Sequence, residues 1–190
     1  MRHKYFVNGL VLARFPFSED SESLILLTDE LGLLKARVRA IRKPSAKLAS
    51  SLQTLTESKM SLVHGKLGWQ LFGARCVRQW APKFSFDARA RAARVSELLI
   101  RLAPGELKQV SLYDTFIGFF KALDEFPEEF HESIEQLAAL RTVHALGLDD
   151  GVLPARSGES IYYSEVLRAL REDSREYIMR INRGIVASGL

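Results

Sequence analysis

Residues 32–41 read GLLKARVRAI, and this short stretch decides the fold of the first half of the chain. Apolar side chains alternate with basic ones, which is the period of two expected of a strand with one buried face. The apolar set is Leu34, Ala36, Val38 and Ala40, and the basic set is Lys35, Arg37 and Arg39. The stretch therefore predicts a β-strand over Leu33 to Ile41 whose apolar side faces a core.

Four further stretches of the first half have the composition of strands and are separated by short polar or glycine-containing turns. Asp29 to Gly32 predict a tight turn before the quoted strand, because Gly32 can adopt the positive φ that such turns often require. The first half is therefore expected to be a small five-stranded β-domain over residues 1–80. The four additional strands are expected over Lys4 to Phe15, Ser23 to Thr28, Leu52 to Val63 and Gly68 to Arg78.

After Trp80 the apolar residues recur at helical spacing. Ser111 and Asp114 form a capping-box pattern, and the apolar residues that follow define one face of a helix: Leu112, Phe116, Phe119, Phe120 and Leu123. Residues 81–190 are therefore expected to form an all-α domain, which makes the chain an α+β protein of two domains. Further helices are expected over residues 87–102, 128–146, 163–170 and 174–187.

Composition excludes several classes of protein. No apolar stretch approaches the roughly 18 residues that a membrane helix needs, so no membrane association is expected. Cys76 is the single cysteine, which excludes a disulfide framework and a cysteine zinc site within one chain and favours a cytoplasmic setting. The net charge of +4 hides an asymmetry, because residues 1–80 carry +7 and residues 81–190 carry −3.

The positive charge is concentrated between Leu31 and Thr56, a run of 26 residues with six basic side chains and no acidic one. A row of like charges on a strand is repulsive unless an anion binds there. A nucleic-acid backbone supplies regularly spaced phosphates, so the row is interpreted as a phosphate-binding surface rather than as a solvated face. The predicted contact residues are Lys35, Arg37, Arg39, Arg42, Lys43 and Lys47.

Aromatic residues accompany the basic run, and exposed rings on a β-barrel commonly stack on unpaired bases. Most of these rings are expected to lie in the core instead, since Phe15 and Phe17 share one face at strand spacing and Trp69 lies in an apolar strand. The full set is Phe15, Phe17, Trp69, Phe72 and Trp80.

An enzymatic function has little support. Cys76 with His64 or His3 is the one candidate pair of nucleophile and base, but a lone cysteine in an alternating strand usually packs as a small apolar residue. The acidic residues between Asp124 and Glu135 open a helix, where carboxylates are favoured in any case. The chain has no phosphate-binding glycine loop. Neither catalysis nor a cofactor is expected.

Parts of the sequence resemble the N-terminal segment of the RecO family of bacterial recombination mediators. The resemblance runs from Val11 to Leu62 and rests on Ser18 to Leu24, on the Thr28 to Leu34 turn, and above all on residues 37–52, RVRAIRKPSAKLASSL. It implies an OB-fold, a five-stranded barrel, followed by a helical domain. Many family members carry a four-cysteine zinc site in that domain. Residues 147–158 contain no cysteine, so no zinc is expected.

The resemblance also implies a function. RecO proteins are non-catalytic: they bind single- and double-stranded DNA, anneal complementary strands, and help RecA replace single-stranded DNA-binding protein. Their direct partners are RecR and the acidic C-terminal tail of single-stranded DNA-binding protein, which docks on the helical domain. In this chain Arg89, Arg91 and Arg94 are candidate contacts for that tail.

Three alternatives remain open from the residues alone. An adaptor protein could use the basic barrel to bind an acidic protein, and it would then have little affinity for DNA. An RNA-binding OB-fold protein would use the same basic row, since contacts to the 2′-hydroxyl are what distinguish RNA from DNA. A nuclease or phosphodiesterase would need clustered carboxylates or histidines beside the basic face, and Asp29 and Glu30 alone do not supply them.

Overall fold

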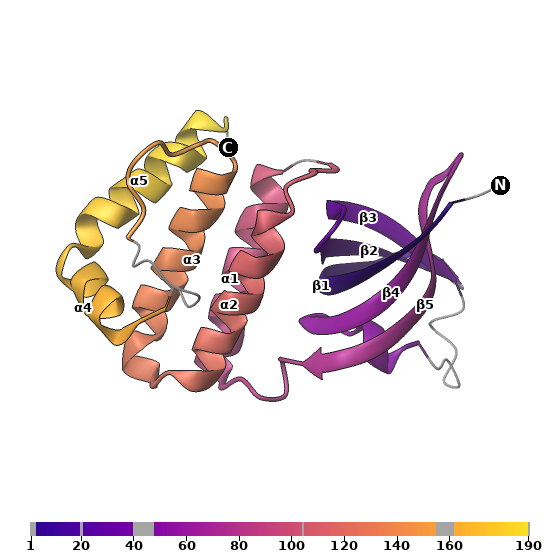
Figure 1. The fold of residues 1–190 in the computed structure, drawn as a ribbon, viewed down its shortest axis with the longest axis horizontal. Coiled ribbons are helices and arrows are strands. Elements are labelled where there is room, and N and C mark those ends of the chain that lie inside the picture. The colour runs from indigo at the N-terminus through magenta and orange to yellow at the C-terminus, as the bar shows by residue number, and fades with distance from the viewer. Residues whose placement is uncertain (1–2, 20, 40–47, 104, 155–161, 190) are drawn as a thin grey trace. The chain divides into compact units, whose positions relative to one another are not determined.

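A computed structural model describes residues 3–19, 21–39, 48–103, 105–154 and 162–189 (Figure 1). The chain divides into two compact units. The first comprises Met1–Lys83 with Gly105–Tyr113, and the second comprises Phe84–Pro104 with Asp114–Leu190. Strands build the first unit and helices build the second, so the predicted α+β class is confirmed.

The five strands of the first unit form a closed barrel in the order β1-β2-β3-β5-β4. Among the described strands, β3 and β5 pair in parallel, and the other neighbours pair antiparallel. This is the five-stranded Greek-key barrel of the OB-fold, as the resemblance implied. The strands are β1 (Lys4–Ser18), β2 (Ser21–Thr28), β3 (Gly32–Arg39), β4 (Thr56–Gly65) and β5 (Gly68–Gln79).

β1 closes the barrel because it is long enough to pair on both sides. Lys4 to Leu10 pair with β4, and Gly9 to Ser18 pair with β2. The two edges overlap at Gly9, where a Cβ atom would lie 2.8 Å from the Met60 sulfur. A larger residue at position 9 would therefore displace the end of the Met60 side chain in the barrel core.

The barrel core is built by the inward positions of the strands, including Leu34, Ala36 and Val38 of β3. Leu52 is also fully buried there, but it lies in a single 3-10 turn (Ser50–Leu52) rather than in a strand. The prediction that the fourth strand begins at Leu52 was therefore wrong by four residues. An apolar residue that plugs the barrel gives the same sequence signal as one at the start of a strand.

The turn between β2 and β3 has the predicted form, with Gly32 at φ +71°. The Thr28 hydroxyl closes it by donating to the Gly32 carbonyl oxygen at 3.0 Å. Leu33 then exchanges two backbone hydrogen bonds of 2.9 Å with Leu107. This pairing explains why Gly105–Tyr113 belongs to the barrel unit, which no sequence pattern indicated.

The second unit is a helical assembly in which α3 packs against α1, α4 and α5. Ser85 caps α1 by accepting a hydrogen bond from the Ala88 backbone N–H. No described helix is both long and apolar enough to cross a membrane. The helices are α1 (Phe86–Leu102), α2 (Ser111–Glu125), α3 (His131–Ala145), α4 (Ser164–Glu172) and α5 (Ser174–Ala187), with a 3-10 turn at Glu128–Phe130.

Candidate nucleic-acid interface

The basic side chains of β3 lie on the outside of the barrel. Lys35 and Arg39 are exposed and Arg37 is half-buried, whereas the residues between them point into the core. The alternation that predicted the strand therefore also places these three cations on one outer face.

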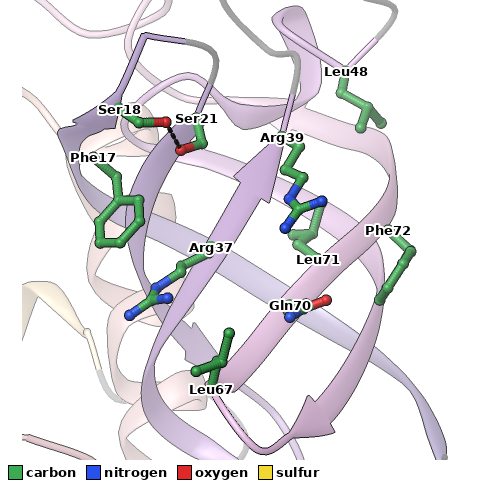
Figure 2. Close-up of a pocket in the computed structure, with 10 residues that line it drawn as sticks. All are labelled: Phe17, Ser18, Ser21, Arg37, Arg39, Leu48, Leu67, Gln70, Leu71 and Phe72. Carbon is green, nitrogen blue, oxygen red and sulfur yellow. Dashed lines mark hydrogen bonds between the residues drawn. The ribbon is translucent and has the colours of Figure 1, made fainter.

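Arg37 and Arg39 line a half-open pocket of about 630 Å³ on this face (Figure 2). Its volume lies within the range of about 300–1,000 Å³ that is typical of ligand sites. None of the described residues that line it is acidic. They are Phe17, Ser18, Ser21, Arg37, Arg39, Leu48, Leu67, Gln70, Leu71 and Phe72.

Strand register assembles this pocket from distant parts of the chain. β3 pairs in parallel with β5, which sets Arg37 opposite Gln70, and antiparallel with β2, which sets Arg39 opposite Ser21. Ser18 is the last residue of β1, at the connection to β2, and Leu67 lies in the connection between β4 and β5. OB-folds bind oligonucleotides with their second and third strands and with these two connections, so the pocket occupies the usual ligand face of the fold.

Three phenylalanines on the barrel surface contradict the expectation that most of the aromatic set is core. Phe15, Phe17 and Phe72 are 48%, 52% and 61% exposed, whereas Trp69 and Trp80 are buried as expected. The Arg37 guanidinium carbon lies 4.2 Å from the centroid of the Phe17 ring, which is a cation–π contact. Outward positions of β1 and β5 can carry large rings because no other element of the described barrel covers them.

The other predicted contact residues are placed differently. Lys35 lies on the same outer face but does not line the pocket, and it is opposite Ile25 of β2. Arg42, Lys43 and Lys47 lie outside the described residues.

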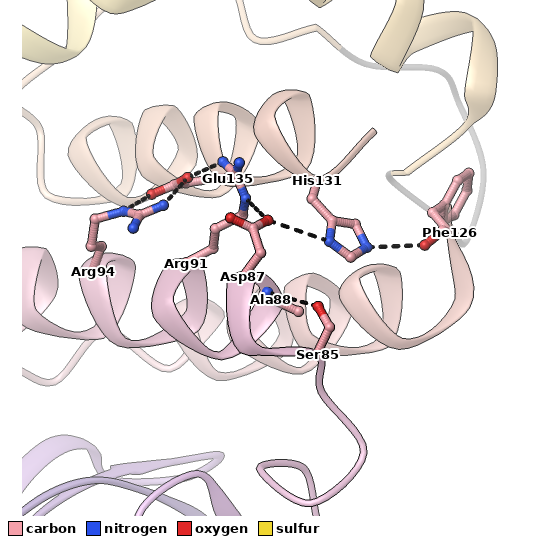
Figure 3. Close-up of polar contacts among 8 residues, drawn as sticks. All are labelled: Ser85, Asp87, Ala88, Arg91, Arg94, Phe126, His131 and Glu135. Carbon is pink, nitrogen blue, oxygen red and sulfur yellow. Dashed lines mark hydrogen bonds and ion pairs between the residues drawn. The ribbon is translucent and has the colours of Figure 1, made fainter. Parts of the chain in front are cut away.

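Two of the three arginines predicted to meet a partner protein form ion pairs within the helical unit (Figure 3). Arg91 donates to Asp87 at 2.5 Å and to Glu135 at 2.6 Å. Arg94 makes a two-pronged contact with the Glu135 carboxylate at 2.6 and 2.8 Å. Arg89 is exposed, and its guanidinium donates to the Phe84 carbonyl oxygen at 3.4 Å. Two of the three cations thus join α1 to α3.

The pKa directions in this network agree with the geometry. Hydrogen bonding from Arg91 lowers the pKa of Asp87. Burial alone would lower the pKa of Arg91, but the hydrogen bonds to Asp87 and Glu135 raise it. The hydrogen bond to Glu135 likewise raises the pKa of Arg94. These groups stabilise one another's charged forms.

The candidate catalytic pair is not assembled. Cys76 is an exposed free cysteine opposite Ser58 of β4, whereas His64 is opposite Trp69 near the other end of β5. The His64 ring packs on Trp69 with 4.8 Å between the ring centroids, and the His3 ring packs on Tyr5 with 4.6 Å between the centroids. Within the described residues, no three histidine, cysteine or carboxylate side chains gather as a metal site.

Comparison with known proteins identifies relatives of the barrel. Residues 1–73 match the family described as recombination protein O N terminal. The chain is 30% identical over 137 residues to the DNA repair protein RecO of Heliobacterium modesticaldum, and the aligned region covers 72% of this chain and 50% of that protein. It is 25% identical over 123 residues to the DNA repair protein RecO of Dehalococcoides mccartyi, where the aligned region covers 64% of this chain and 49% of that protein. The chain spans about half the length of the curated relatives it matches.

Proposed function

The chain belongs to the RecO family, and we propose that it acts in DNA repair and homologous recombination by binding DNA through phosphate contacts. The proposed ligands are single- and double-stranded DNA, and no bond is made or broken in the process. Because bacterial DNA lies in the cytoplasm, we propose that the protein acts there.

The observation that carries this proposal is that Arg37 and Arg39 line one half-open pocket, and that none of the described residues lining it carries a carboxylate. Two adjacent guanidinium groups suit phosphate oxygens, which accept paired hydrogen bonds from arginine. Phosphate contacts do not read sequence. Such a site can bind any strand and leaves most base edges free to pair with another strand.

Free base edges are the basis for the second part of the proposal, which is that the protein anneals complementary strands. We further propose that it assists RecA loading onto DNA coated by single-stranded DNA-binding protein, with RecR and the acidic tail of the coating protein as partners. The family relationship supports these steps. The charge of −3 on residues 81–190 also supports them, because an acidic helical unit would bind DNA weakly and remain available to proteins.

A salt titration tests the phosphate contacts. Fluorescence anisotropy of labelled single-stranded DNA should show an affinity that falls steeply with salt. Replacing both Arg37 and Arg39 by alanine should reduce the slope of log K against log salt by about 1.4, or about 0.7 for each lost contact. The matched control replaces Lys59 and Arg75, which are opposite each other on β4 and β5 outside the pocket. Salt-insensitive binding would contradict the proposal.

An annealing assay tests the recombination role. The protein should accelerate pairing of complementary strands that are coated with single-stranded DNA-binding protein, and the Arg37→Ala/Arg39→Ala variant should not. Equal or tighter binding to RNA of the same sequence, without annealing of coated DNA, would favour an RNA-binding protein instead.

A further inference from the structure

Two of the exposed rings, Phe17 and Phe72, are the extra residues of β-bulges. In the ladder between β1 and β2, Pro16 is opposite Glu22 and Ser18 is opposite Ser21, which leaves Phe17 without a partner position. In the ladder between β4 and β5, the partners of Ser61 and Leu62 are Gly73 and Leu71, so Phe72 is skipped. Bulges re-aim side chains and are common beside functional sites. Here each one presents a phenylalanine at the pocket.

The two rings lie on opposite sides of the arginine row. Phe17 is on β1 and Phe72 is on β5, and β2 and β3 lie between these strands. Figure 2 shows Arg37 and Arg39 between the two rings. On this side of the closed barrel three strand spacings separate β1 from β5, or about 14 Å along the curved sheet in the hydrogen-bonding direction. The line from ring to ring therefore crosses the strands instead of following β3.

Exposure leaves each ring able to bind a flat partner. Arg37 covers part of Phe17 through its cation–π contact, yet Phe17 remains 52% exposed and Phe72 remains 61% exposed. Every unpaired base has a π-face, and stacking on an aromatic ring does not depend on sequence. Bases in a duplex are already stacked on each other and offer no free face.

We propose that a single strand crosses the barrel from β1 to β5, with one base stacked on Phe17, another on Phe72, and the intervening phosphates on Arg37 and Arg39. This inference rests on the proposed DNA binding and deepens it. It assigns a preference for unpaired over paired DNA to two named rings. It also predicts that the bound DNA strand crosses β3 at Arg37 and Arg39 and does not contact Lys35.

The experiment separates bases from phosphates. Fluorescence anisotropy measures the affinity of the protein for three ligands of the same length. They are an oligothymidine, a strand of abasic sugar phosphates, and a duplex. The wild type should bind the thymidine strand more tightly than the abasic one by a factor of about 5 to 150 for each stacked base. The variant Phe17→Ala/Phe72→Ala should lose that preference while its affinity for the abasic strand stays unchanged.

Phe6→Ala provides the matched control. Phe6 is 70% exposed on β1, but it is opposite Ser61 of β4 and does not line this pocket. Its loss should leave the preference for thymidine intact. Phe17→Leu/Phe72→Leu keeps apolar bulk without a ring and should behave like the alanine variant. Thermal unfolding of each variant should match the wild type, since all the altered side chains are on the surface.

The outcomes distinguish this inference from the function on which it rests. Equal wild-type binding to thymidine and abasic strands would overturn the stacking subsite and leave phosphate binding in place. An equal loss of preference in Phe6→Ala would overturn its location. Absence of binding to either strand would overturn both the subsite and the proposed function.

Discussion

The arginines of the barrel face and those of the helical unit differ in what neutralises them. Arg91 and Arg94 share the Glu135 carboxylate, and Arg180 makes two hydrogen bonds to Asp149. Arg37 and Arg39 lie in a pocket whose described lining contains no carboxylate. An ion pair within the protein satisfies a guanidinium, whereas an open arginine row retains its attraction for an external anion. Arginines of the first kind join α1 to α3, or α5 to the segment that follows α3, and those of the second kind suit a ligand.

Charge reversal on the barrel should give the largest effect. Arg37→Glu/Arg39→Glu should weaken single-stranded DNA binding by about 100-fold or more at low salt, because carboxylates would then face phosphates. Anisotropy measures the loss. Lys59→Glu/Arg75→Glu changes the net charge equally on other strands and should have a much smaller effect. Equal losses in both variants would mean that net charge, not this pocket, governs binding.

Loss of the Asp149 carboxylate should destabilise the helical unit without changing the affinity of the protein for DNA. The Asp149 side chain is 7% exposed, and that of Arg180 is 14% exposed. Asp149→Asn should lower the free energy of unfolding at pH 7 by about 2 kcal/mol, as expected for a hydrogen bond between charged groups. Chemical denaturation measures this difference. Unchanged stability would show that the pair contributes little to the fold.

The same pair predicts a pH dependence. Hydrogen bonding from Arg180 holds the pKa of Asp149 below its ordinary value of 3.8, although burial opposes this shift. A carboxylate with a depressed pKa in the folded state stabilises the protein above pH 3.8, and this contribution is lost as the pH falls through the folded-state pKa. The stability difference between wild type and Asp149→Asn should therefore shrink below pH 3.8. A difference that persists in acid would contradict this account.

Glu135→Gln tests the bridge between α1 and α3. The substitution removes the negative charge shared by Arg91 and Arg94. It should lower the free energy of unfolding by about 1 kcal/mol, because Arg94 is half exposed and its ion pair is screened by solvent. DNA affinity should not change. Glu132→Gln, at an exposed position of the same helix, is the matched control for thermal unfolding. Reduced DNA binding by Glu135→Gln alone would show that the two sets of arginines are coupled.

Lys35→Ala should have the smallest effect. Lys35 shares the outer face of β3 with Arg37 and Arg39, but it does not line the pocket. The substitution should reduce DNA affinity by less than about twofold, as expected of a charge that acts at a distance in salt. Arg39→Ala, four residues along the same strand, provides the comparison in the anisotropy assay. A larger effect from Lys35→Ala would place the bound strand along β3 instead of across it.

The sequence by itself determined the elements of the fold. The alternation around Leu34 and Val38 marked β3 and its outer cations, and the spacing of Phe116 and Phe120 marked α2. Period and turn chemistry are properties of neighbouring residues, so they are visible without knowledge of the fold. The same locality explains the misplaced start of β4, since Leu52 is apolar because of the barrel that surrounds it.

Only the tertiary structure decided which residues were available for a ligand. Arg91 and its partner Glu135 are 44 residues apart in sequence, so no local pattern shows that this cation is neutralised. Phe17 and Phe72 come from different strands, and two ladder bulges turn them outward. Exposure and ion pairing depend on what the folded chain brings near a side chain. A sequence can therefore reveal that arginines and aromatic rings are present, whereas the assembled barrel decides which of them face solvent together.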